Sequence, residues 1–289
     1  MKLAAALLLA LAAHAETVDR LLEQKLIREI ERIDAGLDGV LGVSIIDLTT
    51  GRAINHHADA SFPTASSIKV PVMIQLFKTM RAGTLKMDQP LIVTRQDMVA
   101  ESPVAQAALD RGGATTLREM LTAMIEVSDN TATNILIRIA GIPNVNATLD
   151  SLGLPSIRLR RKMIDIAAAI RNEENTASPA EMAKLMAMLY HGKVIGADES
   201  RQMLEILALV KNEMRAAVPP ATRVASKPGL LDGVRCESGV VFVEKRPFAI
   251  SVMTAYLGDE RNVVGEVTAA AHEYFAKLAR ANRYGRYVQ

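Results

Sequence analysis

The period of the hydrophobic pattern changes along the chain and separates several regions. Apolar residues recur at helical spacing in residues 17–37, which predicts an amphipathic first helix that ends at the glycines of 36–39. Residues 40–48 and 53–57 have the pattern of strands, and the turn residues at 49–52 between them predict a β-hairpin. A sheet therefore begins near the amino terminus.

A helical pattern replaces the strand pattern between Ser66 and Val210. Gly, Pro and Asn divide it into helices predicted at 66–81, 115–126, 130–140, 144–152, 179–190 and 198–210. Strands are predicted again at 222–227, 235–243 and 247–257, followed by a closing helix at about 261–281. We therefore expect an α/β (α+β) fold in which residues 16–61 and 211–289 form a sheet domain and residues 62–210 form an inserted all-helical domain.

The first fifteen residues have the pattern of a secretory signal peptide. A lysine follows Met1, an apolar Leu/Ala run follows the lysine, and Ala13-His14-Ala15 matches a cleavage site. The apolar run is shorter than the roughly 18 to 20 residues that span a bilayer, and no cysteine at the cleavage point offers a lipid anchor. We predict cleavage after Ala15, a periplasmic or secreted protein and no stable membrane anchor, against the alternative of a buried N-terminal helix.

Composition limits the classes of partner. The chain has 289 residues, of which 49% are hydrophobic and 3% aromatic, and its formal net charge is +2. That charge argues against binding to nucleic acid or to a membrane surface through a strong basic field. We expect a globular monomer whose partner is a small-molecule substrate, and the function has to be inferred from a site.

Two features outside the main motifs have both functional and structural interpretations. Cys236 is the only cysteine, so it cannot form an internal disulfide and is either buried or reactive; no histidine is well placed to activate it. His56 and His57 lie near Asp59 and suggest metal ligands, but an exposed hairpin explains them better. We predict no metal and no cofactor.

The segment Ser66-Ser67-Ile68-Lys69 matches S-x-x-K at the start of a predicted helix. Positions i and i+3 share a helical face, so the lysine amine can remove a proton from the serine hydroxyl if its pKa is lowered. By itself the motif is weak, because a serine cap followed by a surface lysine has the same pattern.

A second motif strengthens the first. Ser128-Asp129-Asn130 follows some sixty residues after S-x-x-K, in the order typical of penicillin-recognising serine enzymes. The alternative is that these residues only cap the helix that starts at Thr131. The pairing of the two motifs favours catalysis.

With these motifs the chain resembles the class A β-lactamase family, and the resemblance covers nearly all of the chain after the signal peptide. Ser102-Pro103-Val104 resembles the loop before S-D-N, and residues 117–120 and 130–134 resemble the helices around it. Lys227-Pro228-Gly229 stands at the place of the family's K-T-G element. The resemblance implies a β-lactamase/transpeptidase-like fold, with an antiparallel sheet and the active site at the junction with the helical lobe.

The resemblance also implies the groups that form an acyl-enzyme. Ser66 would be the nucleophile, Lys69 its proton acceptor, and Ser128 the relay that protonates the leaving nitrogen. The backbone N–H groups of Ser66 and Leu230 would form the oxyanion hole.

The implied substrate-binding groups come from both lobes. Asn130 would donate a hydrogen bond to the substrate's side-chain amide, and Lys227 would supply positive charge near Ser128 and the substrate carboxylate. Gly229 belongs to the K-T-G-like strand, and Arg235 resembles the family's frequent carboxylate-binding arginine.

The chain departs from the family at two places. Pro228 replaces a threonine whose hydroxyl helps to hold the substrate carboxylate, and a proline without N–H belongs on an edge strand. In the Ω-loop, residues 161–167, Met163 stands where the family's glutamate activates the deacylating water. Asp165 is the nearest carboxylate and the candidate replacement base, although a solvated loop charge explains it slightly better. Asn175 replaces the aspartate that pairs with Arg161, and Asn134 would lose its glutamate partner.

We therefore predict a serine hydrolase that forms an acyl-enzyme with β-lactams and deacylates slowly. One alternative is a penicillin-binding D-Ala-D-Ala peptidase or esterase. Another, from a different class, is a protein that binds β-lactams or peptidoglycan stems without turnover. The Ω-loop distinguishes them, because loss of its base favours trapping over hydrolysis.

Overall fold

The computed structural model describes residues 17–288. The predicted signal peptide and its cleavage site lie outside the described residues. Within them, no helix combines the length and the apolar character needed to cross a membrane.

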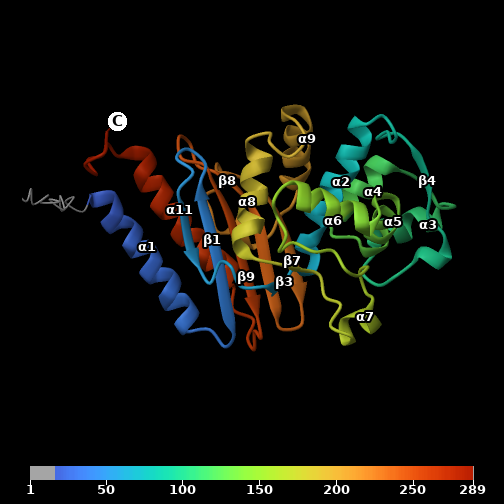
Figure 1. Cartoon of the computed structure of the whole chain (residues 1–289), viewed down its shortest axis with the longest axis horizontal. Coiled ribbons are helices and arrows are strands. Elements are labelled where there is room, and N and C mark those ends of the chain that lie inside the picture. Colours follow the sequence, from blue (N-terminus) through green and yellow to red (C-terminus); the bar gives the residue numbers. More distant parts are fainter. Residues whose placement is uncertain (1–16, 289) are drawn as a thin grey trace, which may run out of the picture.

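Segments from both ends of the chain form one antiparallel sheet with the strand order β2-β1-β9-β8-β7 (Figure 1). Its strands are β1 (Val40–Asp47), β2 (Ala53–His56), β7 (Arg223–Leu231), β8 (Val234–Phe242) and β9 (Phe248–Ala255). The expected antiparallel sheet with helices on its faces is therefore confirmed. The outer strand β7 extends beyond the predicted 222–227 because it pairs with β8 up to the tight turn that joins them.

Alternation along the strands gives the sheet two apolar faces. In β9, Ile250 and Phe248 pack with α1 (Val18–Ala35) and α11 (Val263–Arg280), whereas Met253 and Ala249 belong to the core of the opposite face. The helix α8 (Pro179–Tyr190) packs against β1 and β9. The predicted first and closing helices thus cover one side of the sheet (Figure 1).

The remaining helices form the lobe beside β7 (Figure 1). They are α2 (Lys69–Arg81), α3 (Pro103–Asp110), α4 (Leu117–Glu126), α5 (Asn130–Ala140), α6 (Ile142–Ser151), α7 (Ile166–Ile170) and α9 (Ala197–Leu207), and α10 (Glu213–Ala216) follows them. The buried α2 contacts α4, α5 and α6, and most of its side chains are inaccessible. The site is therefore built on rigid, packed elements.

The lobe is not all-helical, which corrects the sequence-based expectation. Two short ladders interrupt it: β3 (Phe62–Pro63) with β6 (Thr176–Ala177), and β4 (Pro90–Ile92) with β5 (Ala114–Thr116). The helix α3 was not predicted, and the first turn of the predicted helix 66–81 is a separate 3₁₀ turn, η1 (Ala65–Ile68). A second such turn, η2 (Arg95–Asp97), lies before α3. Strands of two or three residues are too short to give a periodic signal.

Candidate active site

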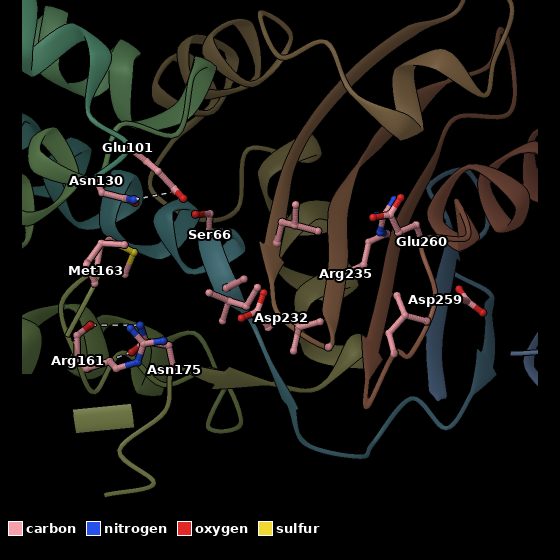
Figure 2. A pocket seen from close by; sticks show the side chains of 17 residues that line it. Ser66, Glu101, Asn130, Arg161, Met163, Asn175, Asp232, Arg235, Asp259 and Glu260 are labelled. Atoms are coloured by element: carbon pink, nitrogen blue, oxygen red, sulfur yellow. Dashed lines mark hydrogen bonds between the residues drawn. The ribbon is translucent and has the colours of Figure 1, made fainter. Parts of the chain in front are cut away.

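Ser66 lies in η1, where the chain enters the helical lobe. Ala65 before it has φ 45°, in the left-handed region that side chains other than glycine rarely adopt. In a 3₁₀ turn the side chains at i and i+3 eclipse, so Ser66 and Lys69 project from the same side. Ser66 lines a cavity of about 510 Å³ between the two lobes (Figure 2).

Lys69 is fully buried below this turn. Its Nζ donates to the backbone oxygen of Ser128 at 2.6 Å, to Ser128 Oγ at 2.9 Å and to Asn130 Oδ1 at 2.9 Å. Burial, and then the nearby charge of Lys227, lower the pKa of Lys69 to about 6. The amine is therefore largely neutral at pH 7, as a proton acceptor has to be.

The S-D-N segment caps a helix, as considered from the sequence, and also places Ser128 beside Lys69. Asp129 caps α5 through a hydrogen bond from Ala132 N, and its other oxygen accepts from the N–H groups of Val104 and Ala105. Ser128 is held at φ 60° with its oxygens facing Lys69. The hydrogen bonds of Asp129 fix the loop before α5, and this loop positions Ser128 beside Lys69.

Lys227 on β7 reaches the same hydroxyl from the sheet side. Its buried Nζ donates to Ser128 Oγ at 3.1 Å and to the backbone oxygen of Pro228 at 3.1 Å. Burial lowers the pKa of Lys227 to about 8. Ser128 Oγ therefore lies between two amines, one mostly neutral and one mostly charged at pH 7.

Gly229 lets β7 approach Ser66 closely. A Cβ on this residue would lie 2.8 Å from Ser66 N and 2.5 Å from the backbone oxygen of Thr64, closer than real contacts allow. The strand therefore needs glycine here, so that the backbone of the next residue, Leu230, can lie opposite Ser66.

The register of the β7–β8 hairpin directs the N–H of Leu230 outward. Leu230 is paired with Arg235, whose backbone N–H and carbonyl exchange hydrogen bonds of 2.9 Å with Thr254 Oγ1 on β9. Because these groups face β9, the residue opposite on β7 presents its own N–H away from β8. This is the geometry that an oxyanion hole with Ser66 N requires.

Comparisons with known proteins agree with this geometry. The sequence profile of the group described as "Beta-lactamase enzyme family" matches residues 25–275. The chain is 30% identical to the Beta-lactamase of Rhodobacter capsulatus over 264 residues, which cover 89% of this chain and 87% of that protein. The chain belongs to the β-lactamase enzyme family. It is accordingly a hydrolase.

Other β-lactamases show the same relationship. Beta-lactamase AST-1 of Nocardia asteroides is 35% identical over 194 residues, which cover 65% of this chain and 62% of that protein. The solved structure of an ancestral (GNCA) class A β-lactamase superposes with a TM-score of 0.79 at 27% identity, covering 88% of this chain and all of that one. The class A fold predicted from the motifs is confirmed.

Pro228 and Arg235, on the sheet side of the cavity, bear on how a substrate carboxylate could be held. Pro228 lies on the edge strand, as expected, and two residues before Leu230 it shares the outward side, so its missing N–H costs no ladder hydrogen bond. Arg235 lines the cavity, but its guanidinium is paired with Glu213. A substrate carboxylate would therefore have to share the guanidinium of Arg235 with Glu213.

In the Ω-loop of this β-lactamase-family protein, hydrogen bonds hold the backbone of Met163, the residue that stands where the family has a glutamate. Asn134 donates to the backbone oxygen of Met163 at 3.1 Å and accepts from its N–H at 2.8 Å. Asn134 therefore has no glutamate side chain to contact, as expected, but it holds the backbone of the residue that stands in the glutamate's place. The side chain of Met163 lines the cavity beside Ser66 and Asn130 (Figure 2).

The acidic residues of the loop have other partners. Asp165 is exposed, accepts a hydrogen bond from Ala168 N at 3.0 Å as the cap of α7, and is not among the residues that line the cavity. Glu174 pairs with Arg161 through both carboxylate oxygens, in place of the aspartate missing at Asn175. The structure does not bring Asp165 to Ser66. Of the other predicted residues, Ser66, Asn130, Leu230 and Arg235 line the cavity, and directly behind them lie Lys69, Ser128, Lys227 and Gly229.

Glu101 is a cavity residue that sequence reasoning missed. It lies just before Ser102-Pro103-Val104, and its Oε2 accepts from Asn130 Nδ2 at 3.2 Å (Figure 2). Only its place directly before that loop could have drawn attention to it.

The surroundings of Cys236 decide between its two interpretations. Cys236 is buried and donates to the backbone oxygen of Thr64 at 3.0 Å. Burial raises the pKa of its thiol to about 11, so it is not an activated nucleophile.

The histidines of the β-hairpin lie beside an aspartate of α1. His56 pairs with Asp34 at 2.8 Å, and His57 also comes close enough for all three residues to reach one metal ion. Asp34, not Asp59, is therefore the carboxylate of this cluster.

Proposed function

We propose that the protein is a β-lactam-hydrolysing enzyme that works through an acyl-enzyme on Ser66. The observation that carries the proposal is the buried Lys69, whose pKa is lowered to about 6 and whose amine contacts both Ser128 and Asn130. A lysine kept neutral one helical turn from a cavity-lining serine is suited to activate that serine.

The proposed acylation moves one proton in a circuit. Lys69 takes the proton of Ser66 as its Oγ attacks the lactam carbonyl, and the resulting oxyanion binds the N–H groups of Ser66 and Leu230. Ser128, which contacts both amines, passes a proton to the lactam nitrogen as the ring C–N bond breaks and is reprotonated by Lys69. Hydrolysis of the ester by water then returns the free serine.

We propose that deacylation is the slow step. Met163 occupies the part of the wall where the family's glutamate would hold the attacking water, and the carboxylates of Asp165 and Glu174 are engaged elsewhere. A missing general base costs about 10²- to 10⁴-fold in rate. The enzyme should therefore accumulate as its acyl form.

A penicillin reporter with intact mass measurement tests this function. We expect covalent labelling of one site, a burst of one equivalent of product followed by slow turnover, and no labelling of Ser66→Ala. Labelling that persists in Ser66→Ala would place the nucleophile elsewhere, and absence of labelling in the natural protein would contradict the function.

We also propose that the protein is exported, cleaved after Ala15 and monomeric, with a small-molecule substrate and no nucleic-acid partner. The A-x-A pattern at Ala13-His14-Ala15 supports cleavage. The mass of protein recovered from the periplasm should correspond to a chain that begins at Glu16, and size-exclusion chromatography should give a single chain. An intact Met1 on periplasmic protein would contradict the cleavage site.

A further inference from the structure

Glu101 is an acidic group that the proposed acylation does not use. Its carboxylate reaches Asn130 Nδ2, and Figure 2 shows it pointing into the cavity towards Ser66. The residue has φ 58°, a conformation that costs an ordinary side chain about 1 kcal/mol or more, and its carbonyl is held by Asn130 N at 3.2 Å. The strained backbone therefore presents this carboxylate to the cavity.

The charges around the cavity are not balanced. Its two arginines, Arg161 and Arg235, are each neutralised by an ion pair with Glu174 and Glu213. Four further carboxylates line the cavity without forming an ion pair to any residue in 17–288: Glu101, Asp232, Asp259 and Glu260. Lys69 is largely neutral at pH 7, and the charged Lys227 behind Ser128 offsets only one of these four carboxylates. The remaining excess of negative charge favours a cationic ligand.

The hydrogen bonds of Asn130 indicate that Glu101 would lie beside the side-chain amide of a substrate. Its Nδ2 already donates to the backbone oxygen of Ala100 at 3.3 Å and to Glu101, while its Oδ1 accepts from Lys69. A substrate amide that takes over a hydrogen bond from Nδ2 displaces the carboxylate of Glu101. The displaced carboxylate then lies beside the atoms attached to that amide and needs a new donor.

We propose, on the basis of the function proposed above, that Glu101 binds a positively charged group on the acyl side chain, so that the enzyme prefers β-lactams with an ammonium next to the side-chain amide. An ammonium supplies the donor that the displaced carboxylate lacks and neutralises its charge. The residue thus selects the substrate class without taking part in bond breaking.

Two penicillins that differ by a single ammonium group, ampicillin and benzylpenicillin, test the inference. At about pH 6.5 an α-amino group is mostly protonated. We expect the ratio of their second-order rate constants for acylation of Ser66, ampicillin over benzylpenicillin, to fall by roughly three- to tenfold in Glu101→Gln, the effect of losing a partly exposed ion pair. Added salt should lower the ratio in the natural protein but not in the variant.

Asp259→Asn is the matched control. It removes a charge from the opposite side of the cavity in Figure 2, and we expect it to change the ratio less than about twofold. An unchanged ratio in Glu101→Gln, with Ser66 still acylated by both penicillins, would overturn the inference and leave the proposed function intact. If neither penicillin acylates Ser66, the proposed function fails and the inference fails with it.

Discussion

Lys69 and Lys227 share one acceptor, Ser128 Oγ, and burial lowers the pKa of each to a different extent. The difference gives them different tasks. The amine with the pKa of about 6 is available as a base at neutral pH, and the amine with the pKa of about 8 stays charged and can stabilise negative charge on the substrate. The nearby positive charge of Lys227 helps to lower the pKa of Lys69.

These two pKa values predict a bell-shaped pH profile for acylation. Below about pH 6 Lys69 is protonated and cannot accept the proton of Ser66, so the rate should rise as the pH passes that value. Above about pH 8 Lys227 loses its charge, so the rate should fall. The second-order rate constant for labelling by a penicillin, measured across this range, checks both limbs.

Lys227→Arg is the control for the alkaline limb. Arginine keeps its charge at every pH in the experiment, so the variant should lose the fall above about pH 8 whatever its absolute rate. A natural protein whose labelling rate stays flat from about pH 5 to 7 would contradict the role of Lys69 as the base.

At the scale of elements, the Ω-loop is held by contacts of its backbone and of its base. Asn134 holds the backbone of Met163 on both sides, and the bidentate pair of Arg161 and Glu174 closes the base of the loop. The position of residue 163 is therefore fixed by contacts that do not involve its side chain.

Met163→Glu should supply the missing base. Because the backbone of residue 163 is already held, a carboxylate there would face the cavity and could activate water for attack on the acyl-enzyme. We expect the deacylation rate to rise by about tenfold to 1,000-fold and the burst to shrink, measured by stopped-flow hydrolysis and by the lifetime of the acyl-enzyme in intact mass spectra.

Met163→Gln is the matched control, since it has the shape of glutamate without the base. It should leave the lifetime of the acyl-enzyme within about threefold of the natural protein. Equal acceleration by both variants would mean that the methionine side chain limits the access of water in the natural protein, and that its removal, not the new carboxylate, speeds deacylation.

Elements with local signals were predictable from the sequence, and those that depend on distant partners were not. The helix 179–190 was predicted with correct ends because Ser178 caps it, a proline opens it and Gly192 follows it. The extension of β7 to Leu231 depends on pairing with β8, and the contact of Glu101 with Asn130 joins two loops. No pattern within either segment encodes such contacts.

At the scale of the whole molecule, a buried acid weakens the sheet domain at neutral pH. Glu237 on β8 is almost inaccessible; its Oε2 accepts from Met214 N at 3.2 Å, and Ser226 lies beside it without a well-formed hydrogen bond to its Oε1. Burial raises the pKa of Glu237 from 4.5 to about 7. The unfolded chain therefore binds fewer protons than the folded chain between these values, and stability falls as the pH rises through them.

Glu237→Gln should remove this penalty. The variant should be more stable than the natural protein at about pH 8, by up to about 3 kcal/mol, and similar at about pH 4.5, where the glutamate is protonated in the folded state. Thermal unfolding of both proteins at the two pH values checks the difference, with a melting temperature higher by roughly 5 °C at the higher pH. A difference of equal size at both pH values would assign it to packing instead of charge.

The junction of the two lobes gives the last prediction. Cys236 of β8 lies beneath η1, where its thiol contacts the backbone oxygen of Thr64 and the hydroxyl of Ser67 at 3.4 Å. Its burial and its raised pKa protect it, so a thiol reagent should label the native protein at least about 1,000-fold more slowly than the unfolded chain. Cys236→Ser serves as the unlabelled control.

The dependence of that labelling on denaturant then shows which motion exposes the thiol. If the lobes separate only when the whole molecule unfolds, the logarithm of the labelling rate should rise with denaturant as steeply as the unfolding equilibrium itself. Because η1 also carries Ser66, such a result means that the nucleophile keeps its geometry until the fold is lost. A labelling rate that is insensitive to low denaturant would instead show that η1 opens by itself, and the catalytic turn would then be a local, low-stability element.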